Sequence, residues 1–127
     1  MAPVKPEKVR VLFECIQPIL CVRDMAASLR FYVDALGFEN AHWGTGDFTQ
    51  VTRDGVGIYL CRNGQGQPGA WIWVGVEDVE QLHTLYKARG LAIRLPPTEY
   101  PWALEMQIED PDGNVLRMGS EPTAGLG

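Results

Sequence analysis

The stretch from Val22 to Gly37, V-R-D-M-A-A-S-L-R-F-Y-V-D-A-L-G, decides the fold. Four apolar residues recur in it at the spacing of one helix face, namely Met25, Leu29, Tyr32 and Leu36. Asp24 is a favourable N-cap for this helix, and Gly37 is a favourable terminator. Residues 13–22, which precede the helix, are apolar and β-prone. The sequence therefore predicts a strand followed by a helix.

Three short strands are predicted to follow this helix. They cover residues 38–43, 48–53 and 56–61. The segment 44–47 separates the first two, and Asp54-Gly55 is a strong hairpin turn between the second and third. The first half of the chain therefore reads βαβββ.

The second half repeats this order after residues 62–69, a loop rich in glycine and glutamine that we interpret as a linker. A strand at 70–76 precedes a helix capped by Asp78, with Gln81 at the capping-box position and Gly90 at the end. Its apolar face consists of Val79, Leu82, Leu85 and Tyr86. Further strands are expected at 91–95, 103–109 and 114–118.

Aligned on their capping aspartates, the halves also match at several residues, namely Val22 with Val76, Tyr32 with Tyr86, and Asp54-Gly55 with Asp112-Gly113. We interpret this as a duplication. The expected fold class is α+β, with residues 1–127 in one domain, module one at about 13–61 and module two at about 70–119. Two short curved sheets, each covered by one helix, would leave a trough, and a trough is a natural ligand site.

The composition excludes several classes of protein. A length of 127 residues suits one domain, and a net charge of -5 disfavours nucleic acid as a partner. No apolar run is long enough to span a membrane, and the first ten residues lack a signal-peptide core, so a cytoplasmic protein is expected. The three cysteines, Cys15, Cys21 and Cys61, form no C-x-x-C pair and are expected to be buried free thiols.

Two motifs resemble the vicinal oxygen chelate superfamily, which includes glyoxalase I, extradiol dioxygenases and bleomycin-resistance proteins. The first is the D-x-x-x-S-x-x-F-Y pattern from Asp24 to Tyr32, and the second is D-P-D-G-N from Asp110 to Asn114. Ala70-Trp71-Ile-Trp-Val74 and Pro101-Trp102 are most similar to the bleomycin-resistance branch. The resemblance implies a glyoxalase/bleomycin-resistance-like fold of two βαβββ modules.

The resemblance also implies where a metal ion would be held. Metal-dependent members place ligands seven residues before each capping Asp and on the last strand of each module, which here gives Gln17, Trp71, Tyr59 and Arg117. None is a histidine or a carboxylate, so neither a metal nor another cofactor is expected. If the register is misplaced, the candidate ligands become Glu14, Glu99, Glu105 or Glu109 with His42, and the protein would be a glyoxalase-like lyase or isomerase, or an enzyme related to the dioxygenases. His83 is expected on the polar side of the second helix.

Aromatic residues stand where the metal site would be. Trp71 and Trp73 alternate on one strand and so share a face; from spacing alone, filling the core beneath a helix is the favoured interpretation. Bleomycin-resistance proteins are metal-free homodimers that exchange an N-terminal strand and sequester a cationic, flat-ringed antibiotic. The resemblance implies the same for this chain. The ligand-binding residues it implies here are Trp71, Trp102, Phe38, Trp43, Phe48, Tyr59, Arg117 and Gln17, with Asp47 and Glu105 facing the cation. A regulatory or partner-binding module without a small ligand is the remaining alternative.

Overall fold

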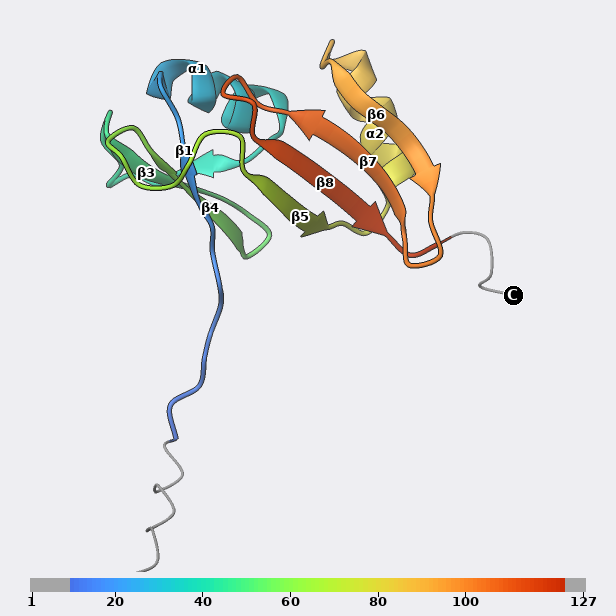
Figure 1. Cartoon of the computed structure of the whole chain (residues 1–127), viewed down its shortest axis with the longest axis horizontal. Coiled ribbons are helices and arrows are strands. Elements are labelled where there is room, and N and C mark those ends of the chain that lie inside the picture. Colours follow the sequence, from blue (N-terminus) through green and yellow to red (C-terminus); the bar gives the residue numbers. More distant parts are fainter. Residues whose placement is uncertain (1–9, 123–127) are drawn as a thin grey trace, which may run out of the picture.

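The computed structural model describes residues 10–122, which form two four-stranded sheets with a helix on each (Figure 1). Sheet 1 and its helix comprise β1 (Ile19–Cys21), α1 (Met25–Leu29), the π-helix η1 (Arg30–Ala35), β2 (Glu39–Asn40), β3 (Phe48–Arg53) and β4 (Val56–Cys61). Sheet 2 and its helix comprise β5 (Trp71–Gly75), α2 (Val79–Ala88), β6 (Ile93–Glu99), β7 (Leu104–Glu109) and β8 (Val115–Ser120). The predicted α+β class and the order βαβββ, twice over, are confirmed.

The two modules share one topology. The strand order is β1-β4-β3-β2 in sheet 1 and β5-β8-β7-β6 in sheet 2, and in each sheet the first strand pairs parallel to the last. Val22 donates its backbone N–H to Cys61 at 3.0 Å, and Val76 donates to Gly119 at 2.8 Å in the equivalent place. The side chains of Asp24 and Asp78 both cap helices as the sequence predicts.

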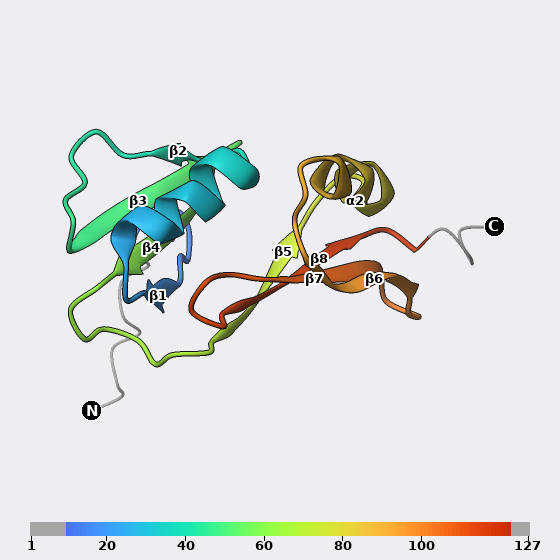
Figure 2. The same ribbon diagram turned by 90° about the horizontal axis from the view of Figure 1, so that it is seen from above.

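Strand alternation divides each sheet into two faces. One face packs against the helix, and its residues form the core: Leu20, Val51, Ile58 and Leu60 in sheet 1, and Met106, Ile108, Leu116 and Met118 in sheet 2. Figure 2 shows α1 with η1 lying against sheet 1 and α2 lying against sheet 2. The alternate residues point away from the helix. We call that side the open face of each sheet.

The structure departs from the predicted bounds in three places. Residues 13–18 are not a strand. Pro18 still accepts a backbone hydrogen bond from Tyr59 at 2.9 Å, and farther toward the N-terminus the described chain runs away from the sheets (Figure 1). Exposed Cys15 lies in this segment, so the expectation of a buried thiol is wrong there. β2 is only two residues long. β6 continues through Pro96 and Pro97, because it is an edge strand with register shifts, where a missing N–H is tolerated.

A buried carboxylate joins the two modules. Asp110 is 5% exposed, and its Oδ2 accepts hydrogen bonds from Tyr32 Oη at 2.8 Å and from Asn114 Nδ2 at 2.9 Å. Its Oδ1 accepts from the backbone N–H groups of Asp112 and Asn114. Asn114 Nδ2 also donates to the carbonyl of Cys21 at 3.2 Å. The D-P-D-G-N turn is thus bonded to both η1 and β1 of the other module.

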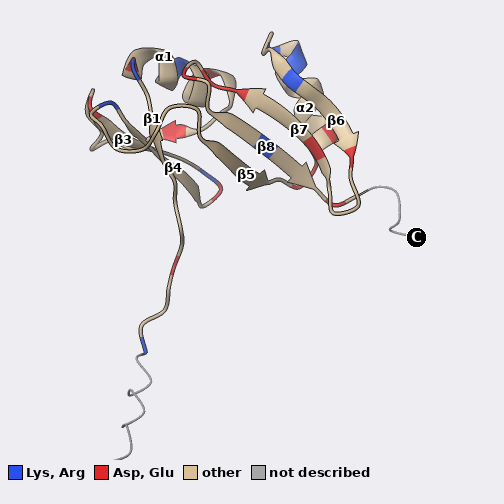
Figure 3. Cartoon of the chain, in the orientation of Figure 1, with Lys and Arg blue, Asp and Glu red and all other residues tan. Residues whose placement is uncertain are grey.

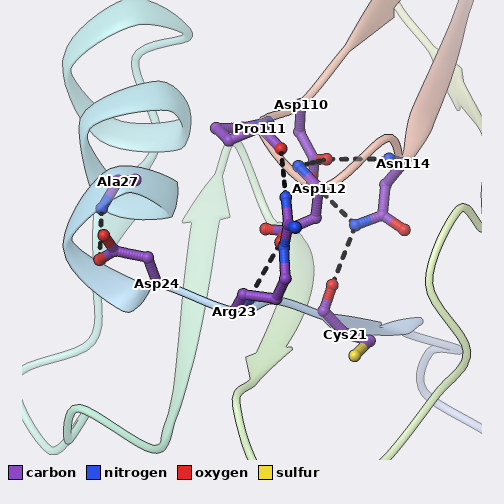
Figure 4. A network of polar contacts seen from close by, with 8 residues as sticks. All are labelled: Cys21, Arg23, Asp24, Ala27, Asp110, Pro111, Asp112 and Asn114. Atoms are coloured by element: carbon purple, nitrogen blue, oxygen red, sulfur yellow. Dashed lines mark hydrogen bonds and ion pairs between the residues drawn. The ribbon is translucent and has the colours of Figure 1, made fainter.

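Arg23 and the second helix add to this junction. Arg23 donates from its backbone N–H and from Nε to Asp112 Oδ1, at 3.0 and 2.9 Å (Figure 4). Arg89 Nη1 donates to Ala35 at 2.8 Å, and Tyr86 Oη donates to Leu36 at 3.3 Å, so α2 supplies donors to the carbonyls that end η1. Burial, followed by the Asp110 charge, raises the pKa of Tyr32, which keeps its hydroxyl protonated as a donor.

Within residues 10–122, the helices are too short and too polar to cross a bilayer.

We expect Tyr32→Phe to lower the free energy of unfolding by about 2 kcal/mol, because the charged Asp110 carboxylate loses a donor while remaining buried. The matched control is Tyr86→Phe, which removes a bond to a neutral carbonyl and should lower it by about 1 kcal/mol or less. Urea denaturation of both variants measures the difference. Equal losses would contradict a special role for Asp110.

Candidate functional site

Three tryptophans on sheet 2 are about half exposed to solvent. Trp71 and Trp73 occupy alternate positions of β5 and are 53% and 56% exposed, while Trp102, in the loop before β7, is 60% exposed. Ile72 and Val74 take the positions between and pack on the core. Trp71 and Trp73 therefore lie on the open face, and the interpretation that they fill the core is wrong.

Glu105 holds two of these indoles. Its side chain is 2% exposed, and its Oε2 accepts hydrogen bonds from Trp73 Nε1 at 2.9 Å and from Trp102 Nε1 at 2.8 Å. Its Oε1 accepts from Nε and Nη2 of Arg117, at 2.9 and 2.7 Å. Figure 3 shows the basic segment of β8 beside the acidic segments of β7. The prediction that Glu105 presents a free carboxylate to a cation is therefore wrong, because Glu105 instead positions three neighbouring side chains.

Two glycines allow Trp73 to lie flat on the sheet. Gly75 and Gly119 are register partners on β5 and β8. A Cβ on Gly119 would lie 2.7 Å from Cζ2 of Trp73, and one on Gly75 would lie 3.1 Å from Cζ3. Any larger residue at Gly119 would displace the ring, so the absence of a side chain there determines where the indole lies.

Arg94 on β6 covers Trp71. Its guanidinium carbon lies 4.9 Å from the centre of a Trp71 ring, within cation–π range. Arg94 Nε donates to Glu109 Oε1 at 3.2 Å, and Arg94 Nη1 donates to Gln107. Arg94 was not predicted from the sequence, because the register shifts in β6 mean that strand alternation does not give the direction of its side chain.

A second aromatic group lies on the open face of sheet 1. Phe48 stacks on Tyr59, with ring centres 5.3 Å apart and planes 17° apart, and on Trp43, at 6.2 Å and 29°. Gln50, the register partner of Tyr59, donates from Nε2 to Gln17 Oε1. The predicted ligand-binding residues thus form two groups. The open face of sheet 1 has Gln17, Trp43, Phe48 and Tyr59, and the open face of sheet 2 has Trp71, Trp102, Glu105 and Arg117.

The remaining predicted residues lie elsewhere. Phe38 is 6% exposed and packs edge-on against Tyr32, so it belongs to the core, where it also lines a cavity of about 710 Å³ between the modules. Asp47 is paired with Arg62, whose Nε lies 3.0 Å from Asp47 Oδ1. His42 is exposed in the β2–β3 loop, and His83 is half-buried on α2.

The residues at the four superfamily positions do not suit a metal ion. Trp71 and Arg117 offer no lone pair to a cation, and Gln17 Oε1 already accepts a bond from Gln50. The alternative metal ligands, namely the glutamates considered for a shifted register, do not surround one point either. Glu105 is held by Arg117 and Glu109 is ion-paired with Arg94, whereas Glu14 lies in the exposed segment before β1. Among the residues that the structure describes, no three His, Cys, Asp or Glu side chains form a group that could hold a metal.

Burial of Glu105 tends to raise the pKa of its carboxyl, but the hydrogen bonds from Trp73, Arg117 and Trp102 outweigh it, and the net effect lowers the pKa. The folded state therefore favours the ionised carboxylate more than the unfolded state does. This contribution to stability is present above the unfolded pKa of about 4.3 and is lost as the pH falls through the folded pKa.

We expect Glu105→Gln to lower the free energy of unfolding by about 2–3 kcal/mol at pH 7, because Arg117 loses its counter-ion. Below about pH 4 the difference in the free energy of unfolding between variant and wild type should become smaller. Glu109→Gln, which removes a half-exposed partner of Arg94, is the control and should change stability by about 0.5 kcal/mol. Urea denaturation at several pH values tests this; a gap that is constant with pH would contradict it.

Comparison with known proteins gives a consistent result. The fold resembles a bleomycin-binding protein from bleomycin-producing Streptomyces verticillus, solved with copper(II)-bleomycin, at 29% identity over 87% of this chain and 98% of that one (TM-score 0.75). It also resembles a superfamily member from Sphaerobacter thermophilus, at 25% identity over 87% and 98% (TM-score 0.72). An antibiotic-binding protein from a Streptomyces species, at 24% identity over 88% and 99% (TM-score 0.77), shares the fold. No curated sequence matches.

A family model matches residues 15–118, which include both modules and both motifs that meet at Asp110. The chain therefore belongs to the Glyoxalase/Bleomycin resistance protein/Dioxygenase superfamily.

Proposed function

We propose that this protein sequesters a flat, antibiotic-like small molecule, without catalysing its conversion, by stacking it on the aromatic open faces of the sheets. The observation that carries the proposal is the set of three half-exposed indoles on sheet 2, two of which are fixed by the buried carboxylate of Glu105. Rigid aromatic side chains provide contact area without losing rotamer freedom when a ligand binds.

The chemistry of the residues supports binding rather than catalysis. On sheet 2, Arg117 donates hydrogen bonds to Glu105, and on sheet 1, Gln50 donates a hydrogen bond to Gln17. A general base or nucleophile needs a group poised to exchange a proton or attack a substrate, and the lowered pKa of Glu105 makes it a poor base. The similar protein solved with copper(II)-bleomycin makes bleomycin-type antibiotics the first ligands to test.

We expect copper(II)-bleomycin to quench the intrinsic tryptophan fluorescence to saturation at roughly one ligand per chain. Trp71→Ala should weaken binding about fivefold, the effect of losing about 1 kcal/mol of stacking. Val56→Ala is the control, because Val56 lines the cavity between the modules and not an open face. Copper(II) sulfate alone controls for quenching by the metal.

Two results would contradict the proposal. A flat response to copper(II)-bleomycin and to flat aromatic compounds up to high micromolar concentration would exclude binding at the tryptophans. Weakening by Val56→Ala and not by Trp71→Ala would place the ligand in the cavity instead.

We further propose that the protein is a homodimer in which the segment before β1 is exchanged between subunits. Val11, Leu12, Phe13 and Ile16 are 70–98% exposed in this segment, which lies away from the sheets (Figure 1). β1, β2, β5 and β6 are edge strands in this chain. An exposed apolar segment and an open sheet edge can cover each other in a second copy.

The dimer should show a mass of twice 14.1 kDa by light scattering at micromolar concentration. Phe13→Asp should shift it toward monomer, because a charge would enter the covered apolar segment. Cys15→Ser, a conservative change at an exposed residue in the same segment, should leave the mass unchanged. A monomeric wild-type chain would exclude the dimer.

A further inference from the structure

Among the residues that the structure describes, the open face of sheet 2 contains no unpaired carboxylate for a cationic ligand. Both oxygens of Glu105 accept two hydrogen bonds each, and its side chain is 2% exposed. Asp47 is ion-paired with Arg62, and Glu109 with Arg94. A cation could reach Glu105 only by displacing Arg117 or an indole. Asp47 and Glu105, the two residues predicted to face a cationic ligand, are therefore already paired with arginines of this chain.

The face of Trp71 already carries a cation. The Arg94 guanidinium lies 4.9 Å from the ring centre, in the place that a cationic ligand would take. A positively charged ring stacked beside it would meet like charge, which opposes binding. On sheet 1, Phe48 and Tyr59 with Gln17 and Gln50 are uncharged, and exposed Glu39 lies farther along that face, opposite Thr52.

A hydrogen-bond donor, in contrast, is available at the centre of the sheet 2 face. Arg117 pairs in register with Trp73 on one side and with Gln107 on the other. Its Nε and Nη2 bind Glu105, and within residues 10–122 its Nη1 has no hydrogen-bond partner. The Arg117 side chain is 35% exposed. The Glu105 pairing fixes the plane of the guanidinium, so Nη1 points in a determined direction.

The geometry points to a ligand whose flat aromatic ring carries an acceptor oxygen, neutral or anionic, bonded to Arg117 Nη1. This inference rests on the proposed function, and it names the ligand class: a carboxylate, phenolate, sulfonate or quinone carbonyl on a fused ring. The rings supply stacking area, and Arg117 selects for the acceptor. Glu105 is the positioning residue, because it acts through Arg117 and the indoles.

The test uses two ligands that share one ring and differ in charge: anthracene-2-carboxylate and 2-(aminomethyl)anthracene, which is a cation at pH 7. Titrations of the full chain are followed by tryptophan fluorescence and by calorimetry. They are made at 0.15 M salt, where the net charge of -5 is screened beyond about 8 Å. We expect the carboxylate to bind at least tenfold tighter than the cation. Equal binding, or tighter binding of the cation, would overturn the inference while leaving the proposed function in place.

A double variant tests the assignment to Arg117. Arg117→Gln combined with Glu105→Gln removes both charges of the ion pair and keeps an amide oxygen for the two indoles. The preference for the carboxylate should fall below threefold, with binding of the cation unchanged. Arg30→Gln, a change of an exposed arginine on η1, is the control and should leave the preference intact.

Circular dichroism of the double variant is the check that it is folded. If the folded double variant keeps the tenfold preference, Arg117 is not the selecting group. If neither anthracene binds the wild type but copper(II)-bleomycin does, this inference fails and the proposed function stands. If none of the three binds, both fail.

Discussion

The rest of the structure depends on one buried carboxylate. Asp110 accepts four hydrogen bonds, from Tyr32, from Asn114 twice and from the backbone of Asp112. Tyr32 belongs to the first motif and Asp110 to the second, so the two patterns that mark the sequence meet in space. Because an ionised group below the surface is tolerated only when its oxygens are satisfied, this contact specifies one placement of the modules among those that hydrophobic packing would allow.

Much of the fold could be predicted from residues near each other in the chain. The strands at 48–53 and 56–61 and the helix capped by Asp78 have the expected bounds, since alternation, turn residues and capping are local signals. The failures have non-local causes. β6 extends through two prolines because it lies at an edge, which depends on tertiary structure. Residues 13–18 do not form the predicted strand, because a strand also needs a neighbouring strand along its length. Pro18 accepts a backbone hydrogen bond from Tyr59, but the sheet pairing begins at Ile19.

The candidate site was predictable in its residue types more than in their roles. Alternation places Trp71 and Trp73 on one face, but which face carries the helix depends on the sheet as a whole. Glu105 was expected to attract a ligand, and it instead binds Arg117 and two indoles. Two of its donors, Trp73 and Arg117, lie on other strands, 32 and 12 residues away in sequence, so the contact gives little local signal. Arg94 was missed for a similar reason, since bulges in β6 break the alternation.

The alternation of the strands separates two kinds of evolutionary change. In both modules the residues beneath the helix are mostly apolar, with aliphatic or thioether side chains. The open faces differ: sheet 1 has amides with a stacked aromatic row, and sheet 2 has indoles with paired charges. If the modules arose by duplication, one face of each strand diverged while the other stayed alike in chemistry. Because neighbouring residues on a strand belong to different faces, a substitution that alters recognition need not alter the core. A scaffold of this kind can change its ligand without refolding.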